Sequence, residues 1–396
     1  MKGESRLTEK MTRRSFLKKS GATVLIVSWA GLTWRAIDQG VFSTGKGVAY
    51  EPWNVDSAEL EGLVSLVPDA ILASNPHNTQ PWLFKVTNSY IELYADETRN
   101  LGTIDPLRRE MFIGLGCAIE NLMISARAKG YDPRLTYKSS PLKPSCIARI
   151  ELDKSPIVKS PLYDYIPLRH THRGAYDTTR RIPKATLTNI ENLIIDENKV
   201  RLTWMTNSEE KQTVSDLTIK ATEAIIADEK MSADSNKWFK EDWKDIQTER
   251  DGITLDAQGG SFFIRTLGKL LPPLSHEQNN DFWLSSTKDT QTATASVYGL
   301  ISVRDPSDNE QRARAGRAWQ RIHLHGTSIG LGMQPLCQLN EMADHEKSSG
   351  VNNIFSEGLK KLTGDPAWSG VLTFRCGFPL KDTHKSPRRS VEDVLV

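Results

Sequence analysis

The segment NPHNTQPW, residues 75–82, concentrates side chains that can hold a flat polar ligand. Three side-chain amides and an imidazole occur within six positions, at Asn75, His77, Asn78 and Gln80. Two prolines restrict the backbone around them. This density of amides on a stiff backbone favours a binding segment for a planar, hydrogen-bonding group over an ordinary surface loop.

A second segment, PLRHTHRGAY, has the composition of a phosphate site. It contains Arg169, His170, Thr171, His172 and Arg173. Guanidinium groups match phosphate oxygens bidentately, and hydrogen bonds to charged groups contribute about 1.5–3 kcal/mol each. The alternative is a solvated basic turn. The His-x-His pair does not indicate a metal ion, because the neighbouring arginines would repel a cation.

Two further segments could complete a site. GLGMQPLCQ, 330–338, leaves a predicted helix through two glycines, which let a backbone approach a flat ligand closely. HKSPRRSVEDVLV, 384–396, carries Lys385, Arg388 and Arg389 and ends in an apolar, strand-like sequence, which predicts a segment packed onto the body. An ordinary helix-to-strand turn and a solvated basic tail are the respective alternatives.

Composition sets limits on the whole chain. Its 396 residues suffice for two average domains, and 38% hydrophobic and 25% charged residues are ordinary for a globular protein. A net charge of +2 gives no reason to expect nucleic acid as a partner. The four cysteines are scattered and do not make a disulfide framework.

The first 45 residues have the pattern of an export signal. Basic residues in 11–19 are followed by an apolar run in 21–34 and a polar exit. The run is shorter than the roughly 20 residues that span a bilayer stably. Paired arginines before Ser-Phe-Leu-Lys resemble the twin-arginine signal, which is read by an export machinery. We therefore expect an extracytoplasmic or periplasmic protein. The signal could be cleaved or could stay as an inner-membrane tether. The alternative to an export signal is a basic amphipathic tail.

The chain also shows a weak internal repeat. Residues 112–130 and 313–330 both have helical periodicity and end at a glycine. A shift of 200 aligns Gly116 with Gly316, although two amphipathic helices can share small residues by chance. A true repeat predicts two related halves.

The expected boundaries are 50–160 for the first half and 161–396 for the second. The second half is longer because of an insertion at about 228–292, which has little pattern of its own. Long insertions of this kind are often lids over a site.

Together the four segments resemble the nitroreductase family of FMN proteins. ASNPHNTQPWLF resembles that family's segment along the flavin, and RHTHR resembles its ribityl- and phosphate-binding segment. GLGMQPLCQ resembles the turn beside the pyrimidine side of the ring, and SPRRSVEDVL the basic C-terminal segment. The order of the first two is reversed relative to ordinary members, which dimerise and share each FMN between subunits. A fused pseudo-dimer explains this order, and the export signal, DPLRRE at 105–110 and RAGRAWQR at 314–321 point to the Acg-like branch.

The resemblance implies an α+β, nitroreductase-like fold: an internally duplicated pseudo-dimer in one chain, with mostly antiparallel sheets and one shared long-helix interface. It implies one FMN in a composite site between the fused halves, and no metal. The implied cofactor contacts are Asn78, Gln80, Pro81, Arg169, His170, Thr171, Arg173, Leu336, Cys337, Arg388 and Arg389. No side chain is singled out as catalytic.

The leading hypothesis is an exported FMN-dependent oxidoreductase of the nitroreductase type, with a small-molecule electron donor or acceptor. The second is a non-catalytic protein that binds or sequesters FMN beneath a closed lid. The third is a cofactor-free interaction protein that keeps only the scaffold. A further homodimer of the fused chain is compatible with all three.

Overall fold

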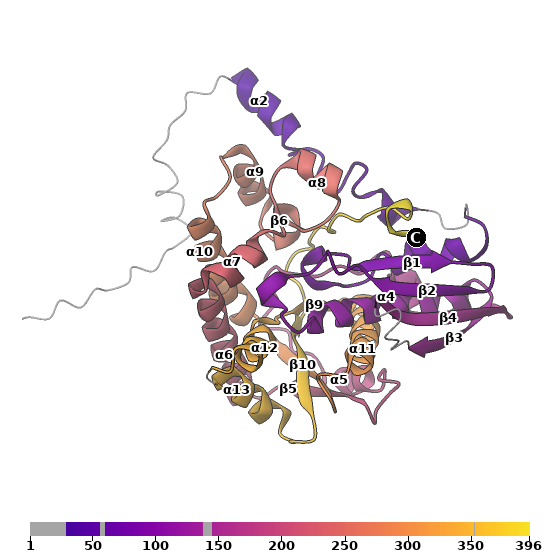
Figure 1. Cartoon of the computed structure of the whole chain (residues 1–396). Helices are drawn as coiled ribbons and strands as arrows, with labels where there is room; N and C mark the ends of the chain where they lie inside the picture. Colours follow the sequence, from indigo (N-terminus) through magenta and orange to yellow (C-terminus); the bar gives the residue numbers. More distant parts are fainter. Residues whose placement is uncertain (1–28, 56–59, 138–144, 352) are drawn as a thin grey trace, which may run out of the picture.

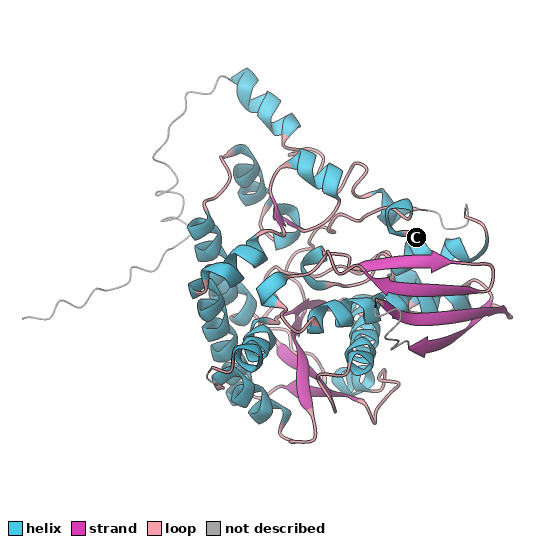
Figure 2. Cartoon of the chain, viewed as in Figure 1, coloured by secondary structure: helices cyan, strands magenta, loops and turns pink. Residues whose placement is uncertain are grey.

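The computed structural model describes residues 29–55, 60–137, 145–351 and 353–396. Most of the predicted export signal, including its paired arginines, lies outside these residues. The described chain is α+β, as predicted, with two four-stranded sheets surrounded by helices (Figures 1 and 2).

The first sheet is antiparallel throughout, in the order β1-β2-β4-β3. Buried apolar residues such as Phe84, Ile91 and Ile150 line its inner face. The strand bounds are Trp82–Val86 (β1), Tyr90–Ala95 (β2), Tyr131–Tyr137 (β3) and Cys146–Lys154 (β4).

The second sheet repeats this topology, in the order β5-β8-β10-β9 with antiparallel pairs. Its strands are Val200–Met205 (β5), Val297–Val303 (β8), Gly332–Pro335 (β9) and Ser369–Gly377 (β10). Each sheet has one long helix between its second and third strands along the chain. The identical order and directions confirm that the fold is internally duplicated. Along the sequence, the strands of the first sheet precede residue 160 and those of the second sheet follow it.

The two long helices are α4, Arg109–Ala128, and α11, Asn309–Ser328. They pack against each other, and one continuous apolar core joins both helices to both sheets. Gly130 and Gly330 follow them with φ of 78° and 74°, the left-handed conformation that ends helices. Among the described residues, only α4 is long and apolar enough to cross a membrane, and it is mostly buried inside the protein.

Further helices complete the body around these elements. A second apolar cluster lies between β8, α6, α12 and α13 and covers the other face of the second sheet (Figure 1). The helix bounds are Val67–Ala70 (α3), Lys184–Glu191 (α5), Ser208–Ala227 (α6), Gln338–Ser349 (α12) and Ile354–Thr363 (α13).

The insertion of the second half is wider and more regular than its sequence suggests. Strands β1 and β2 form a hairpin, whereas the equivalent β5 and β8 are separated by residues 206–296. Helix α6 begins this stretch, and shorter helices follow whose first turns are capped by side chains such as Asp228, Asp242 and Ser275. The elements are Glu229–Asn236 (α7), Phe239–Lys240 (β6), Trp243–Glu249 (α8), Ile253–Thr254 (β7), Phe262–Leu270 (α9), His276–Ser286 (α10) and a π-helical turn, Thr287–Thr292 (η8).

The described chain begins beside the insertion and ends beside the first sheet (Figure 1). Helix α2, Trp29–Asp38, projects from the body beside α9 (Figure 1). The C-terminal segment is packed down, as predicted, but it forms a short 3₁₀ turn, Glu392–Val394 (η9), instead of a strand. Leu395 forms a single parallel bridge to Phe84 at the free edge of β1, and the Val396 N–H donates to the Phe84 carbonyl at 3.0 Å.

Candidate functional site

The segment 75–82 has a strained backbone. His77, Asn78 and Gln80 have φ of 45°, 57° and 52°, and these are three of the five described non-glycine residues at positive φ. Such conformations are held only where the surroundings enforce them, and they cluster at functional sites. Here the Asn75 carboxamide oxygen accepts the Gln80 backbone N–H at 2.8 Å and closes the turn.

Asn78 joins this loop to two distant segments. Its Nδ2 donates to the carbonyls of Gly252, at 3.1 Å, and Pro387, at 2.9 Å, while its Oδ1 accepts from Arg388. The loop, the insertion and the C-terminal segment therefore meet at one buried amide.

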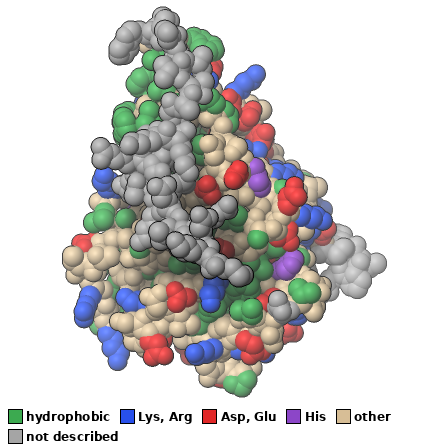
Figure 3. Space-filling model, turned by 90° about the vertical axis from the view of Figure 1, so that its left-hand side faces the viewer, with side chains coloured by type: hydrophobic (Ala, Val, Ile, Leu, Met, Phe, Trp, Pro, Cys, Tyr) green, Lys and Arg blue, Asp and Glu red, His purple; other side chains and the backbone are tan. Residues whose placement is uncertain are grey.

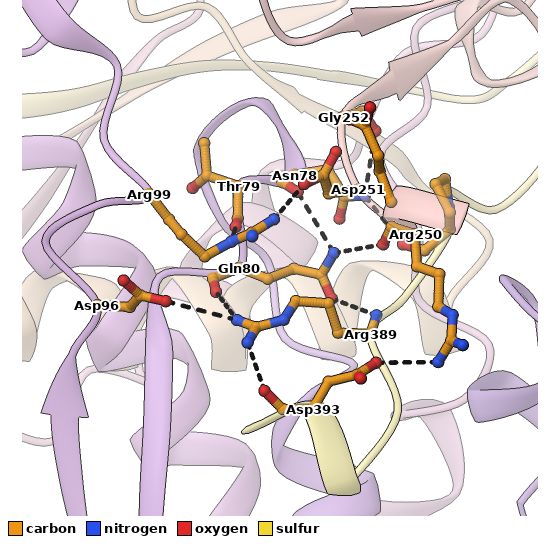
Figure 4. A network of polar contacts seen from close by, with 12 residues as sticks. Asn78, Thr79, Gln80, Asp96, Arg99, Arg250, Asp251, Gly252, Arg389 and Asp393 are labelled. Atoms are coloured by element: carbon orange, nitrogen blue, oxygen red, sulfur yellow. Dashed lines mark hydrogen bonds and ion pairs between the residues drawn. The ribbon is translucent and has the colours of Figure 1, made fainter. Parts of the chain in front are cut away.

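Gln80 makes a second junction of the same kind. Its Nε2 donates to the carbonyl of Arg250 at 2.8 Å, and its Oε1 accepts the backbone N–H of Arg389 at 2.8 Å (Figure 4). Gln80 is completely buried, so its amide holds protein segments together and is not exposed to a ligand.

A pocket lies beside this loop, with about 300 Å³ of empty space that is partly open to solvent. It contains residues from both sides of residue 160, and none of them is acidic. The lining residues are Trp53, Ser74, Asn75, Asn78, Arg169, His170, Thr171, Arg173, Ser386 and Arg388.

Three arginines give this pocket a strong positive charge. Arg169 and Arg388 are 2% and 3% exposed, Arg173 is partly buried, and in the described chain none of the three has a carboxylate partner. Burial lowers the pKa of Arg169 and of Arg173 to about 10. Burial, and then repulsion from Arg169 and Arg173, lowers the pKa of Arg388 well below its usual range. The arrangement stores unfavourable electrostatic energy that a bound anion would relieve.

Backbone contacts set the positions of the two most buried arginines. The Arg169 guanidinium donates to the Leu72 carbonyl at 2.9 Å, and the Arg388 backbone N–H donates to the Ala49 carbonyl at 2.7 Å. The Arg388 guanidinium also lies 4.7 Å from the ring centre of Trp53. The buried Nε–H groups of both arginines have no hydrogen-bond partner, so each still has a donor for a ligand.

The structure brings six of the predicted contacts together and leaves five outside the pocket lining. The six are Asn78, Arg169, His170, Thr171, Arg173 and Arg388; the five are Gln80, Pro81, Leu336, Cys337 and Arg389.

The helix-exit turn holds its two predicted contacts away from the pocket lining. Leu336 and Cys337 are buried in the apolar core, and Cys337 precedes α12. The same turn contacts the arginine-containing segment through its backbone, because the Met333 carbonyl accepts the His172 N–H at 3.1 Å. The cause is the short strand β9, which begins at Gly332 and carries the later residues into the core.

Three lining residues escaped the sequence interpretation. Ser74 and Ser386 lie in the segments 73–84 and 386–395 but were not predicted as contacts, and Trp53 lies outside all four segments. The indole N–H of Trp53 donates to the Ser386 carbonyl at 2.8 Å, which ties the C-terminal segment to the pocket wall. For Trp53, a single tryptophan in the polar stretch at the start of the first half was the only available signal.

Histidines near the site are held neutral. Burial, followed by repulsion from Arg173, lowers the pKa of His77 to about 4. Burial also lowers the pKa of His170 and of His172. Within the described ranges, no three His, Cys, Asp or Glu side chains are grouped as metal ligands.

Comparison with known proteins relates part of the chain to nitroreductases. No family model matches it. Two proteins of Mycobacterium tuberculosis, from strains CDC 1551 and H37Rv, are each named "Putative NAD(P)H nitroreductase" and are 28% identical to it over 136 residues. The match covers 33% of this chain and 38% of each relative, so it spans little more than a third of their length.

Two solved nitroreductases with bound FMN show low overall similarity. The protein from Desulfitobacterium hafniense is 12% identical, with 60% of this chain and 98% of that chain covered and a TM-score of 0.37. The protein from Bacteroides fragilis is 15% identical, with 57% and 94% covered and a TM-score of 0.32.

Proposed function

We propose that the protein is an FMN-dependent oxidoreductase of the nitroreductase type, whose arginine pocket holds the cofactor phosphate. The pocket unites three guanidinium groups without a carboxylate, and this single observation carries the proposal. A phosphate dianion supplies the missing counter-charge and accepts from the free Nε–H groups. The partial sequence match to two proteins named as nitroreductases supports the choice of reaction type.

The proposed site is composite. Asn75 and Asn78 belong to the first half, whereas Arg169 and Arg173 belong to the second. This division supports a pseudo-dimer that keeps one flavin site between its halves. FMN, when bound, supplies the two-electron redox chemistry, and the chain's own residues bind the phosphate, stiffen the loop and exclude water.

The insertion limits access to this site. The pocket is narrow, because its empty space of about 300 Å³ includes the solvent at its mouth. Residues 250–252 are hydrogen-bonded to the loop, so we infer that they shift when a three-ring cofactor enters. The same contacts favour a second candidate function: a protein that sequesters FMN beneath a closed lid, without turnover.

Comparing FMN with riboflavin tests the phosphate assignment, because the two differ only in that group. We expect FMN to bind at least about 100-fold more tightly, as two or more charge-assisted hydrogen bonds imply. In Arg169→Gln and Arg173→Gln this preference should fall about 10-fold or more, whereas the exposed Arg181→Gln serves as a control and should keep it. Equal binding of FMN and riboflavin by the unaltered protein would refute the assignment.

Anaerobic titration of the flavin-loaded protein separates the two functions. Bleaching by both NADPH and dithionite, followed by reoxidation with a nitroaromatic acceptor, is expected for the oxidoreductase. Bleaching by dithionite alone points to the sequestering function or to another natural donor. A cofactor-free scaffold would show no flavin absorption even after FMN is added.

We further propose that the chain uses the twin-arginine route, is periplasmic or extracytoplasmic, and belongs to the Acg-like branch. The support is the sequence of residues 11–34. Replacement of Arg13 and Arg14 by lysine should leave the protein in the cytoplasmic fraction, and unchanged export would exclude this route. A further homodimer remains part of the proposal, and light scattering of the full chain tests it.

A further inference from the structure

Helices α2 and α9 present apolar side chains to solvent at one end of the molecule. Trp34 and Ile37 are three residues apart on α2 and share a face. Phe262 and Phe263 begin α9, and Phe42 lies in the turn after α2. These five residues are 63–67% exposed, and we call them the α2–α9 surface. Figure 3 shows hydrophobic side chains gathered at the same end.

The polarity of α9 is the reverse of that of a helix facing water. Its Lys269 is buried and forms an ion pair with the buried Asp256 at 2.6 Å, and Arg265 pairs with the same carboxylate at 3.0 Å. The phenylalanines, in contrast, point outward. Amphipathic helices on a globular protein ordinarily place charges outside and apolar residues inside.

The surface is also rigidly held. Arg35 of α2 donates to the carbonyls of Leu270 and Leu271, at 2.7 and 3.0 Å, at the end of α9. Lys269 donates to the Gly40 carbonyl at 3.1 Å, which fixes the turn after α2. These hydrogen bonds hold the two helices that carry the exposed aromatic residues in a fixed arrangement. Contiguous exposed apolar patches of this kind mark interaction surfaces.

The preceding sequence indicates what covers this surface. No charged residue occurs from Ser20 to Trp34, so the uncharged run continues directly into α2. Immediately before it come Arg13, Arg14, Lys18 and Lys19, which complement anionic lipid headgroups. Exposed Trp and Phe are the side chains that settle at a lipid–water interface.

We propose that the α2–α9 surface rests on an anionic lipid bilayer. The body then docks against the membrane through aromatic side chains, in addition to any attachment through the preceding run. This contact does not depend on flavin binding.

Site-specific fluorescence on the full chain tests the proposal. All four native cysteines are buried, so a cysteine introduced on the surface can be labelled selectively. Phe263→Cys and Trp34→Cys each receive a polarity-sensitive dye, and Ile157→Cys, 71% exposed and outside the surface, is the control. Vesicles contain phosphatidylethanolamine and phosphatidylglycerol, with and without brominated acyl chains.

The expected result is a blue shift and quenching by brominated chains at positions 34 and 263, several-fold stronger than at position 157. Unchanged emission at 34 and 263 in vesicle-bound protein would overturn the proposal. A blue shift in the absence of vesicles would also overturn the proposal, if it grew with protein concentration and the molecular mass in solution doubled. A second copy of the chain would then cover the surface.

Discussion

Gly116 and Gly316 occupy equivalent positions in α4 and α11, and each faces the backbone of the opposite helix. A Cβ atom on Gly116 would lie 2.0 Å from the Ala313 carbonyl oxygen, and one on Gly316 would lie 2.0 Å from the Ile113 carbonyl oxygen. Both pairs are related by the same shift of 200 residues. The helix pair therefore has the reciprocal contacts of a two-fold interface, inside a single chain.

This contact predicts that Gly116→Ala and Gly316→Ala both destabilise the protein. The added methyl group must push the two helix backbones apart, at a cost of about 1–3 kcal/mol or more. Urea unfolding measures the effect. Gly260→Ala is the matched control, because its Cβ would meet only ordinary contacts at 3.5 Å or more. Equal stability of all three variants would show that the helices are not in backbone contact.

Arg173→Met should make the ligand-free protein more stable while weakening its phosphate binding. Burial lowers the pKa of Arg173 to about 10, so its charge costs the folded state about 2–3 kcal/mol at neutral pH. Its one hydrogen bond, to the Ala257 carbonyl, is long at 3.4 Å, so little is lost. Thermal unfolding with and without inorganic phosphate measures both effects. A lower melting temperature without ligand would contradict the buried-charge interpretation.

The stability of the protein should fall between pH 6.5 and about 4, partly because of His77. Its folded-state pKa is lowered to about 4, so over this range the unfolded chain binds a proton that the folded chain does not. The free energy of unfolding therefore decreases as the pH falls, by up to about 3 kcal/mol from this residue. Asparagine tolerates a positive φ, so His77→Asn should keep the loop and make the free energy of unfolding less dependent on pH. Identical pH profiles for the two proteins would exclude this role.

Gln80→Ala should open the junction between the insertion and the C-terminal segment. The Arg389 N–H loses its acceptor and the Arg250 carbonyl loses its donor, at a cost of about 1–3 kcal/mol. Hydrogen exchange should become faster at Arg389 and in residues 250–252. Gln212→Ala is the control, because Gln212 is exposed and bonds only to Asp216. Slow exchange at these residues in Gln80→Ala would mean that other contacts hold residues 250–252 and the C-terminal segment together.

The amino-acid sequence by itself determined the long helices, their glycine ends and the chemistry of the arginine pocket. Helical periodicity and left-handed glycines are local properties, so they can be read without the fold. Local charge also marks Arg169, Arg173 and Arg388 as anion ligands wherever the chain brings them together.

Only the tertiary structure decided which of the predicted residues share a pocket. Gln80 turned out to be satisfied by backbone groups of Arg250 and Arg389, 170 and 309 residues away, and no local pattern encodes such partners. Leu336 and Cys337 were drawn into the core because β9 starts at Gly332 and pairs with β10. The exposure of Phe262 and Phe263 was also decided by the tertiary structure. The ion pair between Lys269 and Asp256 turns the charged face of α9 inward, which leaves the phenylalanines outside.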